Sequence, residues 1–176
     1  MNIKKFWYKD IRCFHEEEAI PVIQGIIKDF EPELMIEFGT SFGGMTLIFH
    51  EMYPDVELHT FDRPDITEFP NRRKVTEKHL FGESVIFHQV DIISYPLEEI
   101  IVLLKDGRKK FLYCDNGNKP REMEMYSKYL NKNDMIGCHD WGTEIFNGDV
   151  QGLSLTPIDH EIFEVNNWRS RFWVKQ

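Results

Sequence analysis

Hydrophobic and polar positions alternate along the chain in blocks that predict buried strands separated by amphipathic helices or loops. Short apolar runs occur at residues 34–38, 56–61, 84–90, 110–114 and 134–138. Successive strands that are separated by helical crossovers pair in parallel, with helices on both faces of the sheet. The pattern therefore predicts an α/β fold with a doubly wound, mostly parallel sheet.

Helical spacing of apolar residues marks three segments, at residues 16–30, 96–105 and 122–130. The first opens with acidic residues, which favour the positive end of a helix, and it carries Pro21 in its first turn, where proline is tolerated. The second is followed by Gly107, which is predicted to end it as a C-terminal cap. The residues of the third segment expected to point inward are Met125, Tyr129 and Leu130.

Three other stretches have weaker patterns. Residues 1–14 mix aromatic and basic side chains without a clear period, and residues 67–80 are expected to be helix or loop. Residues 161–165 and 170–174 alternate like two strands joined by residues 166–169. That alternation predicts an antiparallel hairpin at the end of the chain.

Size and composition are those of an ordinary globular domain. The chain has 176 residues, a mass of 21.0 kDa and 41% hydrophobic residues, which fits one domain with a sizeable core. No apolar run is long enough for a membrane span, and the first residues lack the apolar core of a signal peptide. We therefore expect a cytoplasmic protein with no membrane partner.

Charge and cysteine usage exclude some classes of partner. The net charge of −9 and the small basic clusters at residues 72–74 and 108–110 argue against a nucleic-acid footprint, which needs a basic face. The cysteines Cys13, Cys114 and Cys138 form no C-x-x-C pair, so neither a disulfide framework nor a zinc ribbon is indicated. A small-molecule substrate remains the expected partner.

A glycine-containing turn follows the first apolar run. Gly39 allows a sharp turn with positive φ, and Gly43 and Gly44 let the next helix start close to a ligand. The spacing is neither the G-x-G-x-x-G dinucleotide fingerprint nor a P-loop. Glu37 precedes the turn in an otherwise apolar strand, where burying a carboxylate is costly without a hydrogen-bonded or cationic partner.

An acid also follows each later strand. These residues are Asp62, Asp91, Asp115 and Asp140. In a parallel sheet all four would project at the carboxyl edge, where open α/β sheets bind their ligands. An acid after the second strand can accept hydrogen bonds from ribose hydroxyls, but this use is shared by dinucleotide enzymes, so Asp62 alone does not identify the cofactor.

The segment from Glu37 to Gly43 resembles the first motif, acidic-x-Gly-x-Gly-x-Gly, of class I S-adenosylmethionine-dependent methyltransferases, with Ser41 in place of the middle glycine. The resemblance implies a Rossmann-like fold whose glycine loop wraps the methionine part of S-adenosylmethionine (SAM). The acid helps to hold its ammonium group, Asp62 binds the ribose, and Asp91 lies beside adenine with Val90 or Ile92 flanking the ring. The implied cofactor-binding set is Glu37, Gly39, Thr40, Ser41, Gly43, Asp62, Asp91, Ile92 and Asp115.

Residues 113–119 and 137–142 resemble the fourth and fifth strand ends of O-methyltransferases of the macrocin and cephalosporin-tailoring type (cephalosporin hydroxylase-like), which bind a divalent metal. Carried over, the metal ligands are Asp115, His139 and Asp140. His139 replaces an acid, which weakens the case for magnesium and leaves manganese, iron or no metal open. Either a metal acidifies the substrate hydroxyl, or His139 removes its proton as a general base. Lys119 is predicted to steady an anion, so the catalytic set is His139, Asp115 and Lys119.

The favoured function is O-methylation of a hydroxyl on a small molecule or sugar by a single methyltransferase-like domain. That domain comprises an N-terminal segment and helix (1–32), a cofactor-binding core (33–142) and a closing segment (143–176). The alternatives are a nucleotide-sugar or dinucleotide-binding enzyme and a non-catalytic cofactor-binding protein. The chain leaves little for a substrate cap, so a homo-oligomer, or residues 1–14 with 144–160, is expected to close the site.

Overall fold

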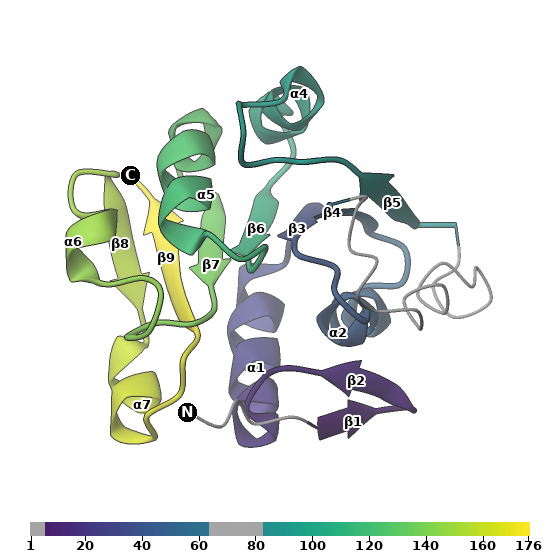
Figure 1. Cartoon of the computed structure of the whole chain (residues 1–176), viewed down its shortest axis with the longest axis vertical. Coiled ribbons are helices and arrows are strands. Elements are labelled where there is room, and N and C mark those ends of the chain that lie inside the picture. The colour runs from purple at the N-terminus through teal and green to yellow at the C-terminus, as the bar shows by residue number, and fades with distance from the viewer. Residues whose placement is uncertain (1–5, 64–82) are drawn as a thin grey trace.

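A computed structural model describes residues 6–63 and 83–176 of the chain. Its elements alternate between strands and helices for most of the length (Figure 1). In chain order they are β1 (Phe6–Tyr8), β2 (Ile11–Cys13), η1 (Glu17–Ala19), α1 (Ile20–Phe30), β3 (Leu34–Phe38), α2 (Gly44–Met52), β4 (Glu57–Asp62), β5 (Val85–Gln89), α4 (Glu98–Lys105), β6 (Lys110–Cys114), α5 (Lys119–Tyr126), η3 (Ser127–Tyr129), β7 (Met135–Cys138), α6 (Asn147–Val150), β8 (Leu155–Ile158), α7 (His160–Val165) and β9 (Arg171–Lys175).

The main sheet has seven strands in the order β5-β4-β3-β6-β7-β9-β8. The five strands from β5 to β7 are parallel, whereas β9 runs antiparallel to both β7 and β8. The strand order reverses between β3 and β6, and ligands of open α/β sheets bind at such a switch point. The predicted doubly wound sheet with a terminal antiparallel pair is confirmed.

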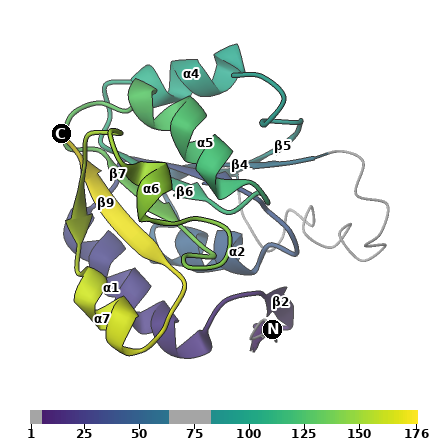
Figure 2. The same ribbon diagram turned by 60° about the vertical axis from the view of Figure 1, so that its left-hand side comes forward.

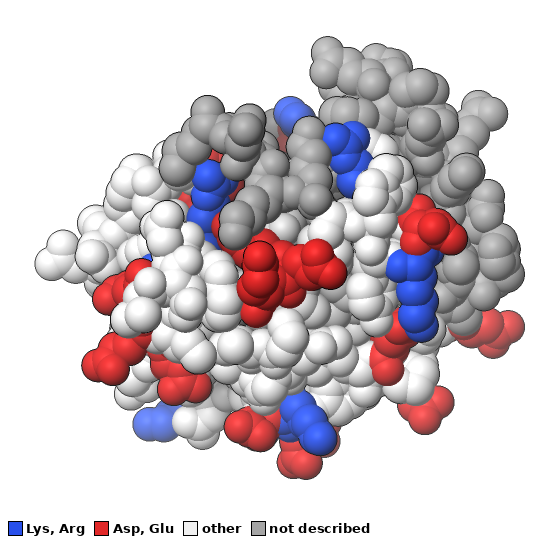
Figure 3. Space-filling model, turned by 90° about the horizontal axis from the view of Figure 1, so that it is seen from below, with Lys and Arg blue, Asp and Glu red and all other residues white. Residues whose placement is uncertain are grey.

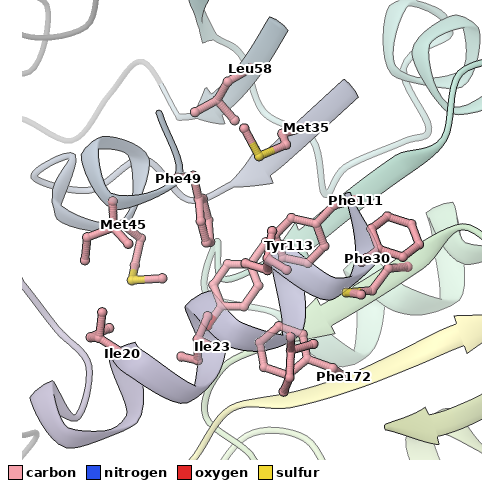
Figure 4. Close-up of a cluster of buried hydrophobic side chains, with 14 of the residues drawn as sticks. Ile20, Ile23, Phe30, Met35, Met45, Phe49, Leu58, Phe111, Tyr113 and Phe172 are labelled. Atoms are coloured by element: carbon pink, nitrogen blue, oxygen red, sulfur yellow. The ribbon is translucent and has the colours of Figure 1, made fainter. Parts of the chain in front are cut away.

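Side chains of each central strand alternate between two hydrophobic cores, as the period of a strand requires. Met35 of β3 and Tyr113 of β6 face one core, which α1, α2 and α7 cover. Ile36 and Leu112 face the other core, which α4 and α5 cover. Figure 2 shows these helices on opposite sides of the sheet, and Figure 4 shows Ile23 of α1 against the aromatic rings of β6.

The predicted strands 34–38 and 110–114 match β3 and β6 to the residue, because both runs are fully buried and, apart from Glu37 and Lys110, apolar on both faces. The start of the third predicted helix differs from the prediction. Helix α5 begins at Lys119 rather than at residue 122, since the side chain of Asn118 accepts a hydrogen bond from the N–H of Arg121 and caps the helix there. Met125 and Leu130 are buried as predicted, and Tyr129 is partly buried.

The prediction that Gly107 caps α4 was wrong. The helix ends at Lys105, and Gly107 does not adopt the left-handed conformation that such a cap requires. The turn is held instead by the carboxylate of Asp106, which accepts hydrogen bonds from the backbone N–H and the guanidinium of Arg108.

The hairpin predicted for residues 161–165 and 170–174 was half wrong. The second segment is strand β9, but its partner is β8, and residues 161–165 lie in helix α7. One helical turn buries Phe163 against the sheet while Ile162 and Val165 stay exposed, so the alternating apolar residues do not form one buried strand face. Pro157 is tolerated in β8 because β8 is the edge strand.

The N-terminal residues, which had no clear period, form a hairpin of β1 and β2 beside α2. The stretch 67–80, expected to be helix or loop, lies outside the described residues.

Within the two described ranges, no helix combines the length and the apolar character that crossing a membrane requires. On the face seen in Figure 3, acidic side chains gather near the centre and lysine or arginine side chains lie at its sides.

Candidate active site at the glycine turn

Gly39 sits between the ends of three neighbouring strands. Its backbone N–H donates to the carbonyl of Phe61 in β4 at 2.8 Å, and the N–H of Asp115 after β6 donates to the carbonyl of Phe38 at 2.8 Å. The φ of Gly39 is 97°, and a Cβ added there would lie 2.2 Å from the carbonyl oxygen of Asp115. Glycine is therefore required for the turn and for the close approach of β6.

The rest of the turn is fixed by backbone hydrogen bonds. One oxygen of Asp62 accepts from the N–H of Ser41 at 2.7 Å, and the other accepts from the N–H of Arg63 at 2.8 Å. Ser41 is left-handed with φ of 50°, and Gly43, with φ of 83°, caps α2. Gly44 has no room for a side chain, because an added Cβ would lie 2.7 Å from the backbone of Arg12.

Glu37 is 1% exposed and lies beneath the turn. The hydroxyls of Thr46 and Thr60 donate to its carboxylate at 2.5 and 2.6 Å. Since the Thr60 proton is used in this way, the hydroxyl of Thr40 donates to that of Thr60, at 2.6 Å, which ties the turn to Glu37. Burial raises the pKa of Glu37 to about 7, although both threonine hydroxyls oppose the rise.

A cavity of about 160 Å³ lies beside the turn. It is lined by residues 12–15 of the N-terminal arm, by residues 39–42 of the turn, and by Asp115, His139 and Asp140. The arm is anchored on the turn because the ring of Phe14 lies 5.6 Å from that of Phe42 and the guanidinium of Arg12 lies over both rings. The switch point thus carries a partly open site with an apolar and an acidic side.

The ammonium group of Lys119 lies among three carboxylates on the acidic side. Its Nζ is 2.8 Å from Asp140, 3.1 Å from Asp115 and 3.0 Å from Glu144. Burial lowers the pKa of Lys119, but these carboxylates outweigh it and raise the pKa well above the usual value. The second oxygen of Asp140 lies 3.4 Å from the guanidinium of Arg169. Both oxygens of Asp140 are therefore engaged by cations of the chain itself.

His139 lies between the same carboxylates and the arm. Its Nδ1 is 3.6 Å from Asp140 and 3.7 Å from Asp115, and its Nε2 is 3.7 Å from Glu16. Burial lowers the pKa of His139, but the three acids outweigh burial and raise it to about 9. Both this Nε2 and the Oε2 of Glu16 are buried without a hydrogen-bond partner among the described residues, and they face each other.

The ring of His15 stacks on that of His139, with centroids 4.1 Å apart and planes 22° from parallel. Nε2 of His15 is 3.0 Å from the hydroxyl of Tyr113. Burial, and then the neighbouring His139, lower the pKa of His15 to about 3. The pair therefore combines a neutral imidazole with a charged one near pH 7, which avoids repulsion between the rings.

The cavity brings together six of the residues predicted for the site, namely Gly39, Thr40, Ser41, Asp115, His139 and Asp140. Asp91 is held in its own turn, where it accepts hydrogen bonds from Ile93 and Ser94. Ile92 is fully buried in the core, whereas Val90 is only partly buried, so Val90 is the better candidate to flank a ring.

Sequence reasoning missed four residues of the charged cluster, which are His15, Glu16, Glu144 and Arg169. They come from the N-terminal arm and from loops after β7 and before β9. No spacing signal links them, because only the fold brings these distant segments together. The sequence predicts a helix start at Glu16, Glu17 and Glu18, and of these only Glu17 and Glu18 are helical.

The sheet order, the glycine turn at the switch point and the acid at the end of β4 define a class I SAM-dependent methyltransferase. A family model described as "Rhamnosyl O-methyltransferase/CmcI" matches residues 2–140. The chain therefore belongs to this family of O-methyltransferases. Predictions of the class and family from the sequence are confirmed.

Solved structures with the same fold are distant in sequence. A putative caffeoyl-CoA O-methyltransferase from Staphylococcus aureus is 12% identical with a TM-score of 0.62, over 90% of this chain and 84% of that one. A structure of CmcI with Mg and SAM is 15% identical with a TM-score of 0.61, over 77% of this chain and 57% of that one. The chain thus spans little more than half the length of CmcI.

A third structure is TomG, an O-methyltransferase from Streptomyces achromogenes involved in tomaymycin synthesis, in complex with SAM. It is 12% identical with a TM-score of 0.56, over 92% of this chain and 81% of that one. A comparison with curated protein sequences gave no match. At these identities the structural comparisons show the shared fold alone.

Proposed function

We propose that the protein transfers the methyl group of SAM to a hydroxyl oxygen of a small molecule or sugar. The observation that carries the proposal is the cavity at the switch point, formed by the left-handed turn at Gly39 and closed by Asp115 and His139. Membership of an O-methyltransferase family supports the reaction class. The structures of CmcI and TomG with SAM support the cofactor.

The cavity fits the methionine part of the cofactor. Its volume of about 160 Å³ is below the roughly 300–1,000 Å³ of pockets that take whole ligands, so it is assigned one end of the molecule. Gly39 and Gly44 also line the cavity, and their lack of a Cβ lets the turn lie directly against the backbone of Asp115 and of Arg12. Asp62 is assigned the ribose, because its carboxylate lies at the end of β4 beside the turn, where it accepts hydrogen bonds from the N–H groups of Ser41 and Arg63.

Glu37 is assigned an indirect part in holding the ammonium group of the cofactor. Its carboxylate is used by the hydroxyls of Thr46 and Thr60, and the chain of hydroxyls reaches the turn at Thr40, which lines the cavity. Gly43 and Asp91 are assigned to support the turn and the adenine end, respectively.

Methyl transfer from a sulfonium needs alignment of the donor and the acceptor oxygen more than covalent help, and alignment supplies much of the rate. Bound SAM supplies the electrophilic methyl group. The acceptor hydroxyl must lose a proton, and His139, which lines the cavity with Nε2 unpartnered, is assigned that proton. Only its neutral form accepts a proton, so the rate rises as the pH approaches the raised pKa of about 9.

The test is an assay of SAM turnover with a panel of hydroxylated acceptors, including phenols and sugars, each beside its deoxy analogue. Demethylated SAM should accumulate only with hydroxyl-bearing acceptors, and mass spectrometry should find one methyl group added to oxygen. The proposal fails if the protein binds SAM but methylates nitrogen or carbon of the same acceptors. Binding of NAD instead would favour the dinucleotide alternative.

A further inference from the structure

The family and the sequence pointed to a divalent metal held by Asp115, His139 and Asp140. In the structure a positive charge of the chain itself already lies among these residues: the ammonium of Lys119 is 2.8 to 3.1 Å from Asp140, Glu144 and Asp115. We propose that Lys119 is the built-in cation of this site and excludes a divalent metal, so that methyl transfer needs no metal ion. Only the statement that methyl transfer needs no metal ion rests on the proposed function.

The number of donors matches the number of acceptors. A lysine ammonium carries three N–H groups and accepts none, and it is surrounded here by three carboxylates, one from the residue after β6 and two from the loop after β7. Lys119 is only 3% exposed, so its charge is compensated by these acids rather than by water. The shortest of these contacts, at 2.8 Å, is a hydrogen bond from the ammonium to Asp140. Lys119 is therefore a positioning residue for Asp115 and Asp140.

Its place in the helix also requires the acids. Lys119 is the first residue of α5, and a cation at a helix N-terminus is disfavoured by the helix dipole. The side chain reaches back from this position to Asp115, four residues earlier in the chain, and across to Asp140. A lysine placed against the dipole and buried persists only where neighbouring acids stabilise it.

A divalent ion would compete directly with this lysine. Ions of this kind bind carboxylate oxygens at about 2.0–2.6 Å, so an ion on Asp115 and Asp140 would lie within a few ångströms of the Lys119 ammonium. Two like charges at that distance repel strongly where water is excluded. The other oxygen of Asp140 faces Arg169, which adds a second positive charge.

A second set of possible ligands, His15, Asp115 and His139, has atoms within 4.8 Å of one another. The lone pairs of imidazole nitrogens lie in the ring plane. Because the two rings are stacked 4.1 Å apart and only 22° from parallel, their nitrogens cannot both point at one ion without turning a buried ring. These three residues therefore do not offer a divalent ion an alternative to the carboxylates that Lys119 occupies.

The experiment measures binding of Mn²⁺ to the full chain by electron paramagnetic resonance, without SAM or acceptor. Wild type is compared with Lys119→Ala and with Lys128→Ala, a matched control that removes one exposed lysine and leaves the same net charge. We expect wild type and Lys128→Ala to bind Mn²⁺ equally weakly and Lys119→Ala to bind at least about tenfold more tightly. Adding Asp115→Asn to Lys119→Ala should abolish the gain.

Two results would overturn the proposal. One is tight Mn²⁺ binding by wild type that Asp115→Asn removes, and the other is a folded Lys119→Ala that binds no better than Lys128→Ala. If Lys119→Ala does not fold, Lys119→Gln takes its place, because its amide can still donate to one carboxylate. Failure of SAM turnover would contradict the proposed function but would leave this metal readout unchanged.

Discussion

Replacing Gly39 by alanine tests the structural basis of the site. The matched control is Gly117→Ala, because Gly117 has a similar φ of 90° but nothing within 4 Å of an added Cβ. At Gly39, where φ is 97°, the added Cβ would lie 2.2 Å from the carbonyl oxygen of Asp115 and 2.5 Å from its carbon. The pair therefore separates the backbone strain of a left-handed alanine from the steric overlap between β3 and β6.

The expected sizes follow from these two contributions. A left-handed alanine costs about 1–2 kcal/mol, which is the whole effect expected for Gly117→Ala. The overlap at Gly39 is with backbone, which cannot rotate away, so the end of β6 must move, and overpacking of this kind costs about 1–3 kcal/mol more. We expect Gly39→Ala to lower the free energy of unfolding by about 2–5 kcal/mol in total.

Urea denaturation of wild type and both variants measures these free energies, with unchanged m-values as the check on two-state unfolding. Gly39→Ala should also weaken SAM binding by at least about tenfold, because the turn and Asp115 line the same cavity. Equal destabilisation by the two variants, within about 0.5 kcal/mol, would refute the steric argument. Unchanged SAM affinity in Gly39→Ala would refute the placement of the cofactor.

Three further variants test the electrostatics of the site. Because the pKa of Glu37 is raised to about 7, the contribution of Glu37 to the free energy of unfolding is fully present below pH 4.5 and is lost as the pH rises through 7. Glu37→Gln should remove this loss of roughly 3 kcal/mol, which unfolding titrations between pH 4 and 8 measure. Because the pKa of His139 is raised to about 9, the contribution of His139 to the free energy of unfolding is present below pH 6.5 and is lost as the pH rises through 9. His139→Gln should remove this loss of roughly 3 kcal/mol. A wild-type free energy of unfolding that does not change over this range would contradict the ion pairs described. Asp62→Asn keeps one oxygen acceptor but loses the charge and the second acceptor; we expect about tenfold weaker SAM binding by calorimetry, and unchanged affinity would exclude Asp62 from the ribose site.

The sheet was predictable because its strands are buried on both faces. Continuous apolar runs such as residues 34–38 and 110–114 have no competing interpretation as exposed helix, and the acid that follows each strand marks the edge where the site forms. The role of Gly39 was predictable from the residue after the first of these runs, since only glycine allows the turn. Local sequence thus determines the position of the site.

The partners within the site were not predictable. Lys119 and Glu144 are 25 positions apart and meet only because α5 and the loop after β7 begin at the same edge of the sheet. His15 reaches the site from the N-terminal arm, which has no periodic pattern. Helix α7 was missed for a related reason, since six residues are too few for the helical period to outweigh an apparent alternation.

Calorimetric titration of the wild-type protein with SAM, with its demethylated product and with NAD tests the central claim most directly. The account predicts that SAM and the demethylated product bind once per chain, that NAD does not bind, and that neither Mg²⁺ nor Mn²⁺ changes the affinities. Binding of NAD, or of none of the three, would contradict the assignment of the glycine turn as a SAM site.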